Sequence, residues 1–269
     1  MPTTHGAPTA SVTLPVTVIM PAYNRPAMTR RAVLSAFAQR PLAPAEVLVV
    51  DDCSADETAQ AAREAGARVV RHEVNQGEGA ARNTALQHAS NDWVALLDSD
   101  DEWLPNHLQS LWPERHGRVL VAGTALRRRA DGSHRLMGAV NNRRIDIRSP
   151  ADIAVLRFVT ASAVMIRRDV ALAVGAFRPL PHAADLDLWF RILERGPGCV
   201  SPIVSVIYHE HSGQITLGGS DILKAARDVM LEYRNRPWMT RRVLEGWDAV
   251  VAWHEFQCAR EERDRRVAA

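Results

Sequence analysis

Short apolar runs alternate with amphipathic segments along the first part of the chain. The runs at residues 16–20, 46–50 and 92–97 are continuous and rich in aliphatic residues, which is typical of buried strands. The segments between them show helical periodicity, and the first of these opens with Pro26, a residue suited to a first helical turn. The pattern predicts strands at 16–20, 46–50, 67–72 and 92–97, with helices at 26–39, 54–66 and 80–89 and another beginning at Pro105.

This alternation predicts a parallel sheet with helices on both faces. In such sheets ligands bind outside the carboxyl ends of the strands. Three predicted strands run into polar loops at that edge, with the sequences PAYN, DDCS and DSDD. We therefore expect Asn24, Asp52 and the aspartates of segment 98–101 to surround one crevice, although they lie far apart in the sequence.

After residue 115 the pattern changes. Residues 118–137 predict a strand and a hairpin that turns at Asp131-Gly132. Further along, the chain predicts strands and helices without an internal repeat or a low-complexity linker. These elements are a strand at 162–168, a helix at 185–196, a strand at 201–212, and helices at 221–235 and 238–265.

Composition narrows the class of protein. The chain has 269 residues, of which 46% are hydrophobic, enough for one large α/β domain with or without an appendage. Its net charge of +2 argues against a nucleic-acid binder. Cys53, Cys199 and Cys258 are too few and too widely spaced for a disulfide framework or a zinc site, which favours a reducing compartment. The longest apolar run, at 158–166, is too short to span a bilayer. We expect a cytoplasmic protein whose residues 1–14 form a disordered leader without signal-peptide character.

Several candidate residues carry chemistry. Asp98 and Asp100 form a D-x-D whose hard oxygens suit Mg²⁺ or Mn²⁺, although such pairs also serve in turns and helix caps. Asp52 can accept a hydrogen bond from a nucleobase, or this loop can cap the next helix. Arg82 follows two glycines at a helix start that favours phosphate, or it pairs with a carboxylate.

Two rival nucleotide motifs are absent. The loop PAYNRP stands where a dinucleotide-binding G-x-G-x-x-G would follow the first strand, and no G-x-x-x-x-G-K-[ST] occurs anywhere. A dinucleotide oxidoreductase and a P-loop NTPase are therefore disfavoured.

The chain resembles family 2 glycosyltransferases of the GT-A fold. The resemblance covers roughly residues 15–216 and rests on six blocks in the family's order: VTVIMPAYNRP, EVLVVDDCSADET, NQGEGAARNTAL, WVALLDSDD, AADLDLWFRI and YHEHSGQIT. It implies an α/β fold with a mostly parallel, Rossmann-like sheet flanked by helices, a small hairpin region and C-terminal helices. It divides the chain into a nucleotide-sugar-binding subdomain at 15–115, an acceptor-binding and catalytic part at 116–217, and a helical extension at 218–269.

The resemblance also implies an activity. Such enzymes use Mn²⁺ or Mg²⁺ to transfer a hexose or N-acetylhexosamine, with inversion, from a nucleoside diphosphate sugar to an acceptor hydroxyl, in glycan or glycosylated natural-product biosynthesis. A UDP-sugar is the expected donor. The catalytic base would be Asp185. The metal ligands would be Asp100, Asp98 and His211. The nucleotide-sugar would contact Pro21, Tyr23, Asn24, Asp52, Arg82, Asp98 and Ser99.

One departure from the family concerns the acceptor. The position before Asp185 is Ala184, where the family usually has Glu, so the acceptor site is expected to be unusual. The acceptor itself is undefined and is expected to be a sugar, a lipid-linked sugar or a small molecule. The helical extension carries Trp238, Trp247 and Trp253 and is a candidate cover, homodimer contact, acceptor-binding element or peripheral contact with the inner membrane face. The alternatives are a sugar-phosphate nucleotidyltransferase and a non-catalytic sugar-nucleotide binding module.

Overall fold

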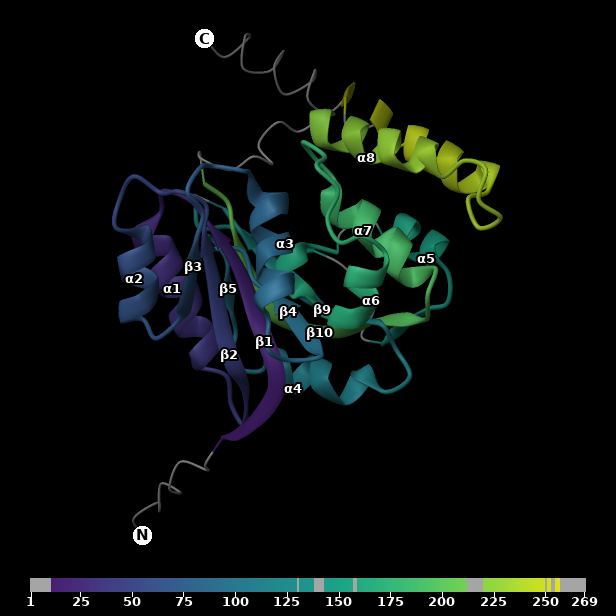
Figure 1. Ribbon diagram of the computed structural model, residues 1–269. Coiled ribbons are helices and arrows are strands. Elements are labelled where there is room, and N and C mark those ends of the chain that lie inside the picture. The colour runs from purple at the N-terminus through teal and green to yellow at the C-terminus, as the bar shows by residue number, and fades with distance from the viewer. Residues whose placement is uncertain are drawn as a thin grey trace.

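The computed structural model describes residues 11–129, 131–137, 143–156, 159–211, 220–249, 251–252 and 255–256. Their strands form one central sheet with helices packed on both faces (Figure 1). The predicted α/β class is therefore confirmed. The strands are β1 (Val12–Ala22), β2 (Leu42–Asp51), β3 (Arg68–Arg71), β4 (Trp93–Leu96), β5 (Glu102–Trp103), β6 (Leu120–Arg128), β7 (His134–Met137), β8 (Ile145–Ile147), β9 (Val164–Arg167) and β10 (Gly198–His209).

The sheet combines a parallel half with a mixed half. Its strand order is β3-β2-β1-β4-β9-β6-β10-β5, and β7 pairs with β6 while β8 pairs with β10. Strands β3, β2, β1 and β4 are parallel, as the alternation predicts. Strand β9 enters between β4 and β6 and is antiparallel to both, whereas β6 and β10 are parallel to each other. The carboxyl ends of β1, β2 and β4 consequently meet at one edge.

Two helical layers bury the two faces of the sheet. The central strands are apolar on both faces, because Ile19 of β1 packs in one core while Val18 and Met20 pack in the other. Figure 1 shows α1 and α2 on one side of the sheet and α3, α6 and α7 on the other. The helices are α1 (Pro26–Phe37), α2 (Thr58–Glu64), α3 (Glu78–His88), α4 (His107–Leu111), α5 (Pro150–Leu156), α6 (Arg168–Ala173), α7 (Ala184–Leu193) and α8 (Ser220–Glu232), with 3₁₀ turns at Trp112–Arg115 and Ala161–Ala163.

Some boundaries differ from the sequence predictions. Strand β1 begins at Val12, inside the predicted leader of residues 1–14, because the Val12 amide donates to the Pro41 carbonyl and aligns the chain with β2. Residues 1–10 lie outside the described part of the chain. The short elements β5, β8, α5 and α6 were not predicted. Strand β5 has two residues, and its pairing with β10 is set by tertiary contacts rather than by a local pattern.

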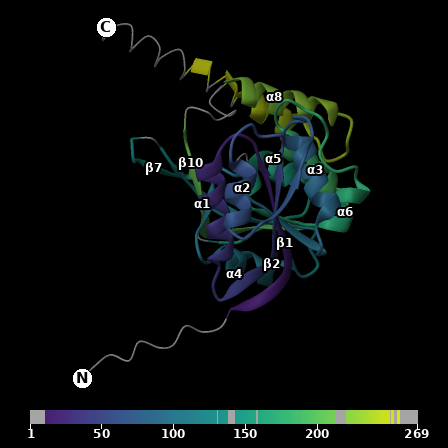
Figure 2. The same cartoon turned by 60° about the vertical axis from the view of Figure 1, so that its left-hand side comes forward.

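The hairpin and the C-terminal helices occur where the sequence predicts them. Strands β6 and β7 are antiparallel, and the Gly132 amide donates to the Arg129 carbonyl at the turn. Figure 2 shows β7, the partner of β6, projecting at the side of the molecule. Helix α8 lies over α7, and residues 241–249 are also helical. The rest of the predicted helix at 238–265 lies largely outside the described residues. Within the described residues no helix has the length and apolarity needed to cross a membrane.

Candidate functional site

Two cavities meet at the carboxyl edge of the sheet. The small cavity, of about 360 Å³, lies at the ends of β1, β2 and β4. The large cavity, of about 810 Å³, extends beneath α7 and α8. Gly77, Glu78, Asp98 and Tyr208 line both. Most of the predicted site residues line one cavity or the other: Pro21, Tyr23, Asp52, Asp98, Ser99 and Asp100 the small one, and Arg82, Asp98 and Asp185 the large one.

Guanidinium groups approach the D-x-D carboxylates. Asp100 Oδ2 lies 2.6 Å from Arg25 Nη1 and 3.0 Å from His211 Nε2. Asp98 Oδ1 lies 2.6 Å from Arg82 Nη2. The contact between Asp100 and His211 joins the β4 loop to the residues that follow β10. Arg25 was not predicted to take part.

The third aspartate of this loop faces the interior. Asp101 is fully buried, its Oδ2 accepts a hydrogen bond from Ser162 Oγ at 2.5 Å, and its Oδ1 accepts one from the His209 amide at 3.2 Å. Burial, together with the nearby Asp98 and Asp100 charges, raises the pKa of Asp101 well above its usual value. Asp101 therefore connects the loop to β10 and is separate from the polar wall of the cavities.

Asp52 fastens the loop that precedes α3. Its Oδ1 lies 2.7 Å from His72 Nδ1 and accepts a hydrogen bond from the Gln76 amide at 2.9 Å. Its Oδ2 accepts one from the Gly77 amide at 2.7 Å. Gly77 has a left-handed φ of 87°, a conformation that glycine adopts without strain. Neither Asp52 nor its neighbours Asp51 and Ser54 cap α2, which begins at Thr58 and has no side-chain hydrogen bond at its cap. These three contacts use three of the roughly four acceptor positions of a carboxylate, so Asp52 can hold this loop and still accept a hydrogen bond from a ligand.

This geometry predicts that substituting Asp52 lowers the stability of the fold. Because the buried side chain accepts two backbone hydrogen bonds and pairs with the buried His72, Asp52→Ala should lower the free energy of unfolding by about 1–3 kcal/mol, the cost of leaving a buried polar group such as the His72 ring unpaired. Urea denaturation would measure the loss, with the exposed Asp228→Ala as the matched control. An unchanged midpoint would contradict the structural role.

Two residues of the loop after β1 have different roles, because Tyr23 lines a cavity and Asn24 holds the loop in place. Tyr23 lines the small cavity and is 45% exposed, so its ring has room for a ligand. Asn24 does not line either cavity. It has a left-handed φ of 49°, and its Oδ1 accepts a hydrogen bond from the Ala55 amide at 2.8 Å. Asn24 thus ties the β1 loop to the β2 loop.

Arg82 is the buried cation of the site. Its guanidinium is shared between Asp98 and Glu78, and it lies 5.3 Å from the centre of the Phe177 ring. Burial alone would lower the pKa of Arg82, but the carboxylates of Asp98 and Glu78 outweigh it and raise that pKa. Arg82 Nε is buried and has no hydrogen-bond partner among the described residues. The structure therefore shows the carboxylate pairing of Arg82, and phosphate binding by Arg82 stays a prediction.

Helix α7 brings Asp185 to the large cavity. Ala183 precedes the helix in a left-handed conformation, so Asp185 is the second helical residue and not the residue that caps the helix. Its Oδ1 accepts a hydrogen bond from the Leu186 amide at 2.8 Å. Burial raises the pKa of Asp185, and the nearby Arg82 opposes that shift. Ala184 also lines the cavity, so this helix start presents one carboxylate.

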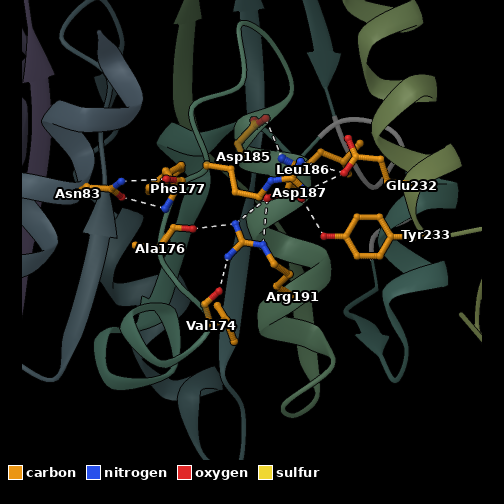
Figure 3. A network of polar contacts seen from close by, with 11 residues as sticks. Asn83, Val174, Ala176, Phe177, Asp185, Leu186, Asp187, Arg191, Glu232 and Tyr233 are labelled. Atoms are coloured by element: carbon orange, nitrogen blue, oxygen red, sulfur yellow. Dashed lines mark hydrogen bonds and ion pairs between the residues drawn. The ribbon is translucent and has the colours of Figure 1, made fainter. Parts of the chain in front are cut away.

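Asp187 lies on the same helix but belongs to a structural network (Figure 3). It is fully buried and pairs with Arg191 at 2.6 Å and with Arg178 at 3.0 Å. It also accepts a hydrogen bond from the Tyr233 hydroxyl at 2.8 Å, and Arg178 pairs with Glu232 at 2.8 Å. Asp187 therefore fastens α7 to the segment before it and to the end of α8.

Sequence reasoning missed some members of the site. Arg25 directly follows the PAYN loop, and His72 ends a predicted strand, so the strand-end rule that selected Asp52 could have found both. Glu78 gave no separate signal, because its position between the cavities depends on how α3 packs. Phe177, which lies beneath Arg82, belongs to a loop without a motif.

The carboxylate oxygens of the D-x-D are of the type that Mg²⁺ and Mn²⁺ prefer, whereas an imidazole is a less usual ligand for Mg²⁺. Asp98 and Asp100 line the small cavity, and the His211 imidazole lies beside Asp100. Among the described residues no three His, Cys, Asp or Glu side chains form a ready-made metal cluster. Mg²⁺ commonly uses one or two carboxylates and completes its shell with water and substrate phosphates, so this set fits such an ion.

The chain is similar to known proteins in sequence and in structure. The family model described as Glycosyl transferase family 2 matches residues 17–175. The UDP-Glc:alpha-D-GlcNAc-diphosphoundecaprenol beta-1,3-glucosyltransferase WfgD of Escherichia coli is 39% identical over 97 residues, which cover 35% of this chain and 38% of that protein. The chain spans about a third of the length of several curated relatives that it matches.

Two solved structures share the fold. TarS 1–349 of S. aureus, in complex with UDP-GlcNAc, has a TM-score of 0.66 and 19% identity, with 90% of this chain and 72% of that chain covered. The mannosyltransferase PcManGT of Pyrobaculum calidifontis, in complex with GDP-Man and Mn²⁺, has a TM-score of 0.62 and 18% identity, with 98% and 79% covered. These likenesses confirm the GT-A architecture, and the family match covers more than half of the chain. The chain therefore belongs to glycosyl transferase family 2.

Proposed function

We propose that this protein transfers a sugar from a nucleoside diphosphate sugar to an acceptor hydroxyl. One observation carries the proposal: the loops after β1, β2 and β4 and the start of α7 surround two cavities that meet at Glu78 and Asp98. The small cavity suits the nucleoside diphosphate, because Tyr23, Asp52 and the D-x-D line it. The large cavity, with Asp185 in its wall, suits the acceptor.

The reaction would proceed by displacement at the anomeric carbon. The acceptor oxygen forms a bond to that carbon, and the bond to the diphosphate oxygen breaks. Asp185 takes the proton that the acceptor hydroxyl loses, since a carboxylate within hydrogen-bond reach can act as the base. A base on the side opposite the leaving group gives inversion.

The charges around the cavities support a divalent cation. Glu78, Asp98, Asp100 and Asp185 carry up to four negative charges, and the guanidinium groups of Arg25 and Arg82 offset two of them. Arg178 also lines the large cavity, but its charge is paired with Asp187 and Glu232. A nucleoside diphosphate would add further negative charge. Mn²⁺ or Mg²⁺ held by Asp100, Asp98 and His211 would offset the charge that develops on the leaving diphosphate. WfgD and TarS carry UDP-sugars in their names or complexes, which favours a UDP-sugar donor.

A donor panel tests this proposal. Incubation with UDP-, GDP- and dTDP-sugars in Mn²⁺ should release nucleoside diphosphate from one donor class, and EDTA should abolish the release. Asp100→Ala should weaken nucleoside diphosphate binding in calorimetry by at least about tenfold, which corresponds to about 1.4 kcal/mol. Asp228→Ala is the matched control. Release that is insensitive to EDTA would contradict the metal, and no release from any donor would favour a binding module. Release of pyrophosphate from a nucleoside triphosphate and a sugar phosphate would favour a nucleotidyltransferase.

A further inference from the structure

The large cavity is polar where it meets the small one and mainly apolar beneath the C-terminal helices, although Arg178 and His182 also line it. Asp98 and Asp185 line the polar end. Leu223 and Ala226 of α8, with Trp247, line the part beneath the C-terminal helices. The volume of about 810 Å³ lies in the range of sites that enclose organic ligands. The shape and chemistry of the cavity therefore suit a ligand with one polar and one apolar end.

The residues next to Asp185 extend the apolar surface to the reacting position. Ala184 lines the cavity with a methyl group, and Leu186 lines it on the other side of Asp185 in sequence. Trp189, one helical turn further along, is 1% exposed and also lines the cavity. Its indole N–H has no hydrogen-bond partner among the described residues, so it remains available to a ligand oxygen.

Building on the proposed function, we propose that the acceptor carries an apolar group, either an alkyl chain or an aromatic ring, beside its reacting hydroxyl. The apolar group occupies the part of the large cavity beneath α8, and the hydroxyl lies at Asp185. Burial of each methylene then increases affinity by roughly three- to fourfold, because apolar surface leaves water. The C-terminal helical extension thereby becomes part of the acceptor site.

Alkyl glucosides provide the probes. Dissociation constants for methyl, hexyl and octyl β-D-glucoside, kept below their micelle concentrations, are measured by tryptophan fluorescence alongside phenyl β-D-glucoside. We expect affinity to rise steeply from the methyl to the octyl compound. Octyl glucoside binding more tightly than phenyl glucoside assigns a lipid chain, and the reverse order assigns an aromatic aglycone. Equal affinity for the methyl, octyl and phenyl compounds overturns the proposal.

Two substitutions locate the binding. Ala184→Glu places a carboxylate in the first turn of α7, where a negative charge is favourable for the helix, so the fold should be retained. It should weaken octyl glucoside binding by about tenfold or more, because a charge then faces the apolar group. Gln60→Glu, which adds the same charge near the start of α2, should leave affinity unchanged. Unchanged octyl glucoside affinity in Ala184→Glu would place the probe elsewhere and overturn the proposal.

A second pair of substitutions tests the same cavity without adding a charge. Leu223→Asn alters the half-buried wall of the cavity, and Leu34→Asn alters an exposed leucine of α1 as its control. Only Leu223→Asn should lower octyl glucoside affinity, and equal effects of both changes would overturn the assignment. Nucleoside diphosphate binding is measured in the same samples. If the unmodified protein does not bind nucleoside diphosphate, the proposed function is contradicted. If it binds nucleoside diphosphate but its affinity for the glucosides does not depend on the alkyl group, only this inference is contradicted.

Discussion

Replacing Asp185 by asparagine is expected to lower sugar transfer by about 10²–10⁴-fold, the usual contribution of a general base. Asparagine has nearly the shape of aspartate and can still accept the Leu186 hydrogen bond, so the start of α7 should be unchanged. Donor affinity should also be unchanged, because the D-x-D loop and the loop held by Asp52 belong to other elements. Steady-state release of nucleoside diphosphate in the presence of acceptor measures the first effect, and calorimetry measures the second.

The raised pKa of Asp185 adds two expectations. Transfer by the unmodified protein should fall as pH decreases through this raised pKa, because the protonated carboxyl cannot accept the acceptor's proton. A group whose pKa is higher in the folded state favours folding at low pH, and that contribution disappears as pH rises through the folded pKa. At neutral pH the ionised Asp185 therefore brings no stability, so Asp185→Asn should not lower the free energy of unfolding. Near-normal transfer by Asp185→Asn would reject the assignment of the base.

The parallel half of the sheet was predictable because its signals are local. Strands β1, β2 and β4 are buried on both faces, so each reads as a continuous apolar run followed by a polar loop. The strand-end rule then placed Asp52, Asp98 and Asp100 at one edge correctly. The mixed half of the sheet was harder to predict from the sequence. Strand β9 lies between β4 and β6 although it follows both in sequence, and this insertion depends on long-range pairing.

The site shows the same division between local and tertiary information. Asp52 was correctly placed, but its partners Gln76 and Gly77 were not, because a hydrogen bond between loops leaves no periodicity. Arg25 and Arg82 lie beside the D-x-D carboxylates, where the sequence predicted Mg²⁺ or Mn²⁺. A bound metal remains a proposal. The roles of Asp185 and His211 came from the resemblance and also remain proposals.

Replacing Asp187 by asparagine is expected to affect stability rather than chemistry. Asp187 is fully buried and balances Arg191, whose guanidinium also donates to the carbonyls of Val174 and Ala176. Arg178 extends toward solvent, so its charge is partly hydrated when the pair is broken. Arg191 is more deeply buried and would lose its counter-charge. Removing one partner of a buried ion pair typically costs about 3–5 kcal/mol, and we expect the free energy of unfolding to fall by about that amount.

Removing the Tyr233 hydroxyl should cause a smaller loss of stability and provides an intermediate comparison for Asp187→Asn. Burial and the Asp187 charge together raise the pKa of Tyr233, so the hydroxyl remains a donor at neutral pH. Tyr233→Phe removes one hydrogen bond to a charged acceptor and should cost about 1.5–3 kcal/mol. In urea denaturation, the loss in free energy of unfolding should therefore be largest for Asp187→Asn, smaller for Tyr233→Phe and smallest for Asp185→Asn. Under conditions where all three variants are folded, only Asp185→Asn should lose sugar transfer. If Asp187→Asn instead unfolds like the unmodified protein and loses transfer selectively, the catalytic base is Asp187, and the network in Figure 3 must rearrange when the substrates bind.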